Sequence, residues 1–130
     1  IWALDEAVFG AKRTAALEVL LKKSRAVVIE VAGQITGFAM CRPFGRGHVI
    51  GPLVAPSETD AIALVGMFVS EHANGFLRLD ADARHTALAK YLDSCGLKKY
   101  DTVVPMTKGQ HFGPEDAADH VYALASHTLG

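Results

Sequence analysis

The stretch Gly47-His-Val-Ile-Gly-Pro-Leu-Val-Ala-Pro56 decides the architecture of this chain, because an extended apolar run passes here directly into a helix start. Residues 48–55 predict a strand. The Gly51-Pro52 pair within it predicts a bulge or an open side, since proline cannot donate to a strand ladder. Ser57 then predicts a helix N-cap, with Asp60 in the position that completes a capping box.

The helix that begins at Ser57 is apolar on all sides over residues 61–69, which predicts that it is largely buried. It should end near Asn74-Gly75, a typical helix stop, and residues 76–79 then predict another strand. A strand, one helix and a second strand form a crossover, which requires parallel strands and a right-handed connection.

The rest of the chain predicts elements on both sides of this crossover. Before it, we expect a helical turn started by Asp5, a second helix, and two strands joined by a turn, the second of them stopped by Pro43. After it, we expect a helix that Asp82 can cap and that stops at Gly96, followed by two strands that pair as a hairpin. The expected ranges are 5–9, 11–23, 27–31, 35–42, 98–106 and 120–126. This order predicts a single α+β domain over residues 1–130, with a mixed, mostly antiparallel sheet of about six strands flanked by helices.

Composition narrows the class of protein without naming its chemistry. The 130 residues carry 13 Lys and Arg against 14 Asp and Glu, a net charge of −1, which argues against nucleic-acid or membrane-surface binding. No apolar run approaches the roughly 20 residues of a membrane helix, and the first residues show no basic n-region and no signal-like cleavage site. The two cysteines form no CxxC pair and the six histidines have no metal-site spacing, so we expect a cytoplasmic domain without a metal.

Several motifs in this order resemble the GNAT acetyltransferases. Val54-Ala55-Pro56 resembles the end of that family's central strand, and the segment 91–97 resembles the end of its later helix. The opening Asp5-x-x-x-Phe9-Gly10-x-x-Arg13 and the closing segment 121–130 resemble the C-terminal GNAT-like half of bacterial proteins with two tandem GNAT modules. The chain also begins at Ile1 with no strand before its first helices. We therefore expect the C-terminal portion of a longer chain.

The resemblance implies an acetyl-CoA site where the central strand separates from its parallel neighbour. The strand end, the following turn and the helix N-terminus would hold the pantetheine arm and the pyrophosphate. In this sequence those residues are Leu53, Val54, Ala55, Ser57, Thr59, Asp60 and Ala61. The family's glycine-rich signature is absent there, and Glu58 and Asp60 place two carboxylates where they would repel a pyrophosphate.

Two residues after the crossover are candidates for acid–base chemistry on an acceptor amine. Asp80 ends the fourth strand, and ligands gather at the carboxyl ends of parallel strands. His85 follows closely and takes the place of an asparagine common in the family motif. The alternatives are a solvated Asp80 and a surface histidine in the first helical turn. Arg42 and Arg46, at the other edge of the presumed cleft, could attract an anion or form salt bridges.

Two functions from different classes remain. One is an acetyl-CoA-dependent N-acetyltransferase that acts on a small-molecule amine or a peptide. The other is a degenerate GNAT-like module without cofactor binding, which serves an intact GNAT domain as a substrate-binding or dimerisation partner. A homodimer, or packing against an N-terminal GNAT module, is expected in either case, because exposed sheet edges invite pairing.

Overall fold

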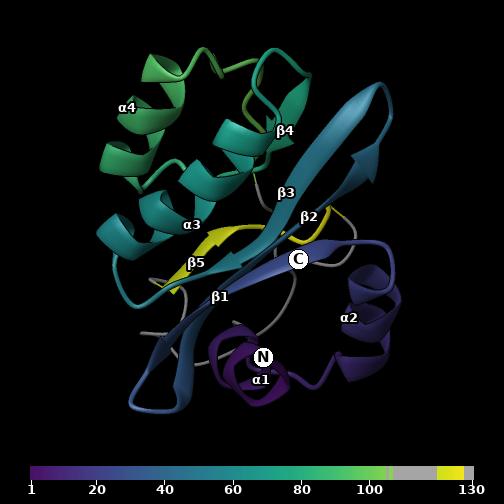
Figure 1. Ribbon diagram of the computed structural model, residues 1–130. Helices are drawn as coiled ribbons and strands as arrows, with labels where there is room; N and C mark the ends of the chain where they lie inside the picture. The colour runs from purple at the N-terminus through teal and green to yellow at the C-terminus, as the bar shows by residue number, and fades with distance from the viewer. Residues whose placement is uncertain (105, 107–119, 128–130) are drawn as a thin grey trace.

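The computed structural model describes residues 1–104, 106 and 120–127, which form a five-stranded sheet with helices on both faces (Figure 1). The described helices are α1 (Trp2–Phe9), α2 (Thr14–Leu21), α3 (Glu58–Glu71) and α4 (Thr86–Ser94), and the strands are β1 (Arg25–Val31), β2 (Gln34–Phe44), β3 (Gly47–Val54), β4 (Leu77–Leu79) and β5 (Val121–Ala123). The predicted α+β class and mostly antiparallel sheet are confirmed. They are consistent with a GNAT-like fold.

Strands β1, β2 and β3 form an antiparallel meander, and β3, α3 and β4 form the predicted crossover with a parallel β3–β4 pair. The ends of β1 to β4 differ from the predicted ranges by at most two residues, and at one of them β2 runs through Pro43 to Phe44 instead of stopping there. The reason lies in the pairing: β1 begins at Arg25, opposite Cys41, so Pro43 lies beyond the end of β1. The missing N–H of Pro43 therefore leaves no β1 carbonyl without its partner.

The bulge predicted at Gly51-Pro52 is present, and it divides β3 into two halves. The β2–β3 register shifts between Ala39 and Cys41, opposite this pair, whose peptide bond is cis. The first half of β3 pairs with β4, with Ile50 opposite Leu79. The second half pairs with β5 instead. The two halves of one strand therefore have different neighbours on the same side.

The predicted C-terminal hairpin is wrong. Within residues 98–106, the positions that the structure describes contain no strand, and Val103, Val104 and Met106 are 62%, 80% and 95% exposed. A β-rich run forms a strand only when another strand lies alongside, and among the described residues none pairs with this run. The predicted strand 120–126 shortens to β5 and pairs with β3. The described sheet consequently has five strands, not about six.

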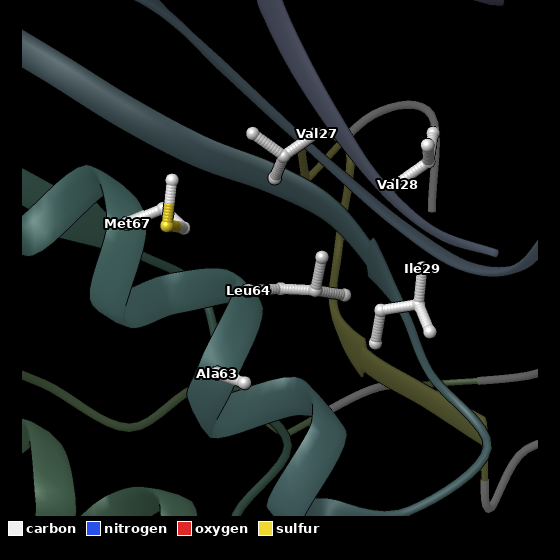
Figure 2. A pocket seen from close by; sticks show the side chains of 6 residues that line it. All are labelled: Val27, Val28, Ile29, Ala63, Leu64 and Met67. Carbon is white, nitrogen blue, oxygen red and sulfur yellow. The ribbon is translucent and has the colours of Figure 1, made fainter.

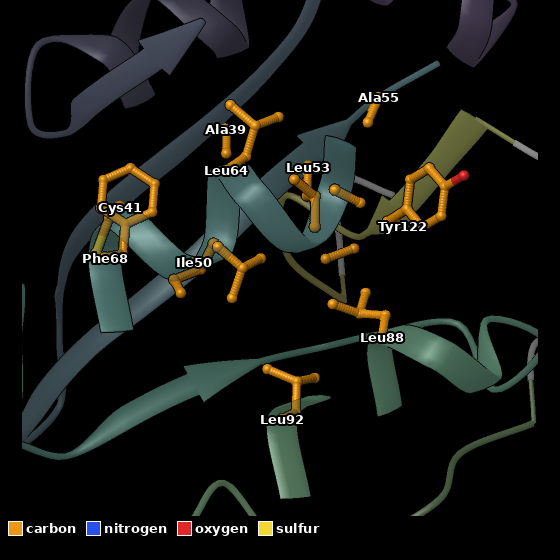
Figure 3. Packing of buried hydrophobic residues seen from close by; sticks show 13 residues of the cluster. Ala39, Cys41, Ile50, Leu53, Ala55, Leu64, Phe68, Leu88, Leu92 and Tyr122 are labelled. Atoms are coloured by element: carbon orange, nitrogen blue, oxygen red, sulfur yellow. The ribbon is translucent and has the colours of Figure 1, made fainter. Parts of the chain in front are cut away.

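The larger core cluster lies between the sheet and the pair α3 and α4 (Figure 3). Ile50 and Leu53 from β3 belong to this cluster together with Phe68 of α3 and Tyr122 of β5. Burial of each large apolar side chain contributes about 1.5–3 kcal/mol. A smaller cluster on the opposite face packs α1 and α2 residues on β2 and β3, with Phe38 at its centre and fully buried.

The motif that opens the chain forms a buried ion pair between α1 and the start of α2. Asp5 does not start a helical turn as predicted, because α1 begins at Trp2 and Asp5 lies inside it. Its carboxylate is 1% exposed and accepts two hydrogen bonds from the Arg13 guanidinium, at 2.8 Å each. The guanidinium also lies 3.8 Å from the centre of the Phe9 ring. Because the pair is buried and bidentate, it holds α1 against the start of α2.

Candidate functional site

The region where β3 and β4 diverge, here called the wedge, is filled by β5. On one side β5 pairs with the second half of β3, with Leu53 opposite Ala123. On the other side it pairs with the chain that follows β4. Asp80 O accepts a hydrogen bond from Leu124 N at 3.1 Å, and Tyr122 O accepts one from Asp82 N at 3.2 Å. Segments far apart in the sequence thus make one continuous sheet (Figure 1).

The strand residues expected to hold a pantetheine arm already have protein partners. Leu53 and Val54 pair with β5, and both are buried. Ala55, which is 1% exposed, donates its N–H to His120 O at 3.1 Å, while its own carbonyl lies 3.2 Å from Nδ1 of His120. A ligand arm that bonded to this strand end would have to replace β5.

The predicted N-cap of α3 is confirmed, and the other residues expected to contact a pyrophosphate differ in their exposure. The Ser57 hydroxyl accepts a hydrogen bond from Asp60 N at 3.2 Å and donates one to the Asp60 carboxylate at 2.5 Å. Thr59 is exposed and Ala61 is fully buried. The first turn of α3 thus carries two carboxylates, those of Glu58 and Asp60.

Glu58 does more than add charge, because it connects α3 to α4. Its Oε1 accepts a hydrogen bond from the backbone N–H of Leu88, in the first turn of α4, at 2.8 Å. A carboxylate there satisfies one of the free donors of that turn and complements the α4 dipole. β5 fills the wedge, and Glu58 and Asp60 lie in the helix turn that would hold the pyrophosphate. The described residues therefore do not fit acetyl-CoA in the way the resemblance implies.

Asp80 lies on the face of the sheet that carries α1 and α2. Its carboxylate accepts hydrogen bonds from Nε and one terminal nitrogen of Arg78 at 2.9 and 3.1 Å, and Nε2 of His127 is 3.5 Å away. The Asp80 side chain is 17% exposed and lines a cavity of about 320 Å³. Sequence reasoning missed both Arg78 and His127, which are 49 residues apart and which only the fold brings together.

His85 lies on the opposite face of the sheet, the face that carries α3 and α4. It is the N-cap residue of α4, and its Nε2 is 3.2 Å from Val121 O. The centre of its ring lies 4.1 Å from that of Tyr122, a residue of the larger core cluster, with the two rings tilted by 35°. The structure therefore does not bring Asp80 and His85 to one point. Asp82, between them, bonds to Arg84, and this hydrogen bond holds the pKa of the Asp82 carboxyl below its usual value.

Neither arginine at the edge of the cleft forms a salt bridge that the structure records. Arg42 donates to Gly51 O at 2.7 Å and to Ala125 O at 2.6 Å. The guanidinium of Arg46 instead lies 4.4 Å from the centre of the Phe76 ring. Burial of Arg42 lowers the pKa of its guanidinium.

A second cavity, of about 360 Å³, lies between β1 and α3 and has no titratable side chain in its lining (Figure 2). Leu64 and Met67 of α3 face Ile29 and Val27 of β1 across it. Cys41 is buried, which raises the pKa of its thiol to about 11 and keeps it neutral, whereas Cys95 is partly exposed. Among the described residues no cluster could hold a metal ion, and no helix there is long and apolar enough to cross a membrane.

Comparison with protein families identifies the class. Residues 1–123 match the family described as the acetyltransferase (GNAT) domain, so the chain belongs to the GNAT acetyltransferase family. That family is one of N-acetyltransferases that typically use acetyl-CoA. Comparison with curated proteins and with solved structures gives no match.

Proposed function

We propose that this chain is a GNAT domain that does not hold acetyl-CoA itself and serves a cofactor-competent GNAT domain as a substrate-binding or dimerisation partner. The observation that carries the proposal is β5, which pairs with β3 and with residues 80–82 and so fills the wedge between them. The acids at the α3 start support the same reading. The fold is kept, and the residues at this strand end are used for internal pairing.

The energetics of displacing β5 support this proposal. Entry of a pantetheine arm would break at least three backbone hydrogen bonds, those of Ala55, Asp82 and Leu124, at about 1 kcal/mol each. It would also expose Tyr122, now 4% exposed, at about 2 kcal/mol. A cost of about 5 kcal/mol lowers affinity by a factor of several thousand. Micromolar binding would then become millimolar or weaker.

The second candidate is an acetyl-CoA-dependent N-acetyltransferase that acts on a small amine or a peptide. The match of residues 1–123 to an acetyltransferase domain favours it. In this function β5 would have to leave the wedge before the cofactor binds. Asp80 or His85 would then accept the amine proton, directly or through water.

Calorimetric titration of the 130-residue chain with acetyl-CoA tests the proposal. We expect no binding at 1 mM cofactor, and we expect the amide resonances of Ala55 and Ala123 to stay unchanged in a parallel NMR titration. Micromolar binding together with shifts at these two amides would overturn the proposal and support the enzyme. Light scattering tests the expected homodimer in the same sample.

A further inference from the structure

The cavity of about 320 Å³ has the composition of a binding site, and it lies apart from the wedge residues expected to hold a cofactor. Arg42, Val49 and Arg78 are paired across β2, β3 and β4, so their side chains share the face of the sheet that carries α1 and α2. Phe44 at the end of β2 and His127 after β5 also line the cavity. Its volume is at the small end of those of ligand pockets.

Arg42 is a half-buried cation of this cavity, and two hydrogen bonds fix its direction. Its two terminal nitrogens are tied to Gly51 O and Ala125 O, one carbonyl from β3 and one from the chain after β5. A guanidinium has five N–H donors, so three remain for a ligand. Among the residues that the structure describes, no carboxylate forms an ion pair with Arg42, and partial burial makes its charge costly to leave uncompensated.

The second arginine of the cavity is already neutralised. Asp80 binds Arg78 through two hydrogen bonds, and the Arg78 guanidinium also lies 5.3 Å from the centre of the Phe44 ring. Asp80 also acts electrostatically on Arg42, so two guanidinium groups share one carboxylate and the cavity keeps a net positive charge. Phe44 and Val49 give it an apolar wall.

We propose that this cavity binds a small organic carboxylate with a compact apolar body, with the carboxylate on Arg42 and the apolar body against Phe44 and Val49. A guanidinium and a carboxylate match in geometry, because two parallel N–H groups can face two oxygens. The apolar wall favours such a ligand over inorganic phosphate. The Ala125 carbonyl helps to aim Arg42, so the position of the segment that closes the wedge also shapes this site.

An NMR titration of the whole chain with phenylacetate tests the inference, with phenylacetamide as the neutral isostere and inorganic phosphate as a second anion. We expect phenylacetate to shift the amides of Phe44, Val49 and Ser126 with a millimolar dissociation constant. The amide and the phosphate should bind at least tenfold more weakly. Equal shifts from acid and amide, or shifts elsewhere in the chain only, would overturn the inference.

Variants assign the binding to Arg42. Arg42→Gln should weaken phenylacetate binding at least tenfold, whereas the control Arg46→Gln, at the neighbouring turn and against Phe76, should leave it unchanged. Phe44→Ala, at a half-exposed side chain, tests the apolar wall if Arg42→Gln does not fold, and it should weaken binding several-fold. Unchanged binding in Phe44→Ala would contradict the proposed pose. Acetyl-CoA is absent throughout, so the result is independent of the function proposed above.

Discussion

The two halves of β3 differ in what lies beside them, although each has a glycine pressed against a neighbouring backbone. A Cβ on Gly47 would meet Phe76 O, just before β4, at 2.0 Å, and a Cβ on Gly51 would meet Leu124 O, just after β5, at 2.1 Å. The first half pairs with β4, the parallel strand at the other end of the crossover, as in open α/β sheets. The second half pairs with β5, which is distant in sequence. The sequence of β3 thus resembles the central strand of the family, but it does not predict that β5 fills the wedge.

The largest effect is expected from adding one methyl group to either glycine. Gly51→Ala and Gly47→Ala should each lower the free energy of unfolding by about 3 kcal/mol, because a backbone oxygen must move aside. Gly51 also has φ 156°, a conformation in which alanine would be strained. Chemical denaturation measures the loss.

Hydrogen exchange then separates the two halves. Gly51→Ala should remove protection from the Leu124 amide and spare the His48 amide, which donates to Phe76 O. Gly47→Ala should do the reverse. If both variants deprotect both amides equally, β3 is one cooperative unit and the contrast between its halves fails.

A loss of similar size should come from Tyr122→Ala, which removes a large buried side chain from the β5 side of the core. Tyr122 is 4% exposed, and its removal should cost about 3 kcal/mol. It should also loosen β5 and raise acetyl-CoA affinity, which calorimetry measures. Tyr122→Phe, which keeps the ring, is the matched control and should leave acetyl-CoA affinity unchanged. A loosened β5 with no gain in cofactor binding would show that β5 is not what excludes the cofactor.

Glu58→Gln tests whether the carboxylates of α3 or the presence of β5 in the wedge excludes acetyl-CoA. It weakens the bond to Leu88 N, so we expect a loss of about 1 kcal/mol in thermal unfolding. Acetyl-CoA binding should remain undetected, because β5 is still in the wedge. The control Asp60→Asn keeps an oxygen near Ser57 and should cost less. If Glu58→Gln binds acetyl-CoA, the carboxylates and not β5 exclude the cofactor.

The smallest effect concerns Asp82, which borders β5 on the β4 side. Its folded pKa is lowered by the hydrogen bond with Arg84, so its stabilisation is complete above the unfolded pKa of about 3.9 and is lost as the pH falls. Asp82→Asn should therefore cost less than about 1 kcal/mol at pH 7. The difference from wild type should vanish in unfolding curves recorded near pH 2. A difference that persists there would place the effect in the backbone turn.

Local patterns predicted the elements whose cause is local. The apolar run of α3, the cap at Ser57 and the bulge at Gly51-Pro52 are all properties of neighbouring residues. The partner of β5 was not predictable in this way, because strand pairing depends on which segments the fold brings together. The strand predicted at 98–106 failed for the same reason.

The candidate site shows the same limit at the level of side chains. Asp80 and His85, predicted to lie together after β4, have separate surroundings: Asp80 bonds to Arg78, and His85 lies against Val121 O and the Tyr122 ring. The partners Arg78 and His127 of Asp80, and the Leu88 amide that binds Glu58, come from separate elements. The Arg78–Asp80 pair is local, since residues two apart on a strand share a face, whereas the contacts of His127 and Leu88 span 47 and 30 residues and belong to no single motif. Their roles in chemistry stay a prediction.

The pairing of β5 with β3 also has a kinetic consequence. Leu53 and Ala123 meet although they are about 70 residues apart in sequence, whereas β1 and β2 are joined by a tight turn. A contact that closes so long a loop is costly to form early, so β5 should join a sheet that already exists. Changes in β5 would then speed unfolding and leave the folding rate almost unaltered. The strand that closes the wedge would govern how long the folded chain lasts more than how fast it forms.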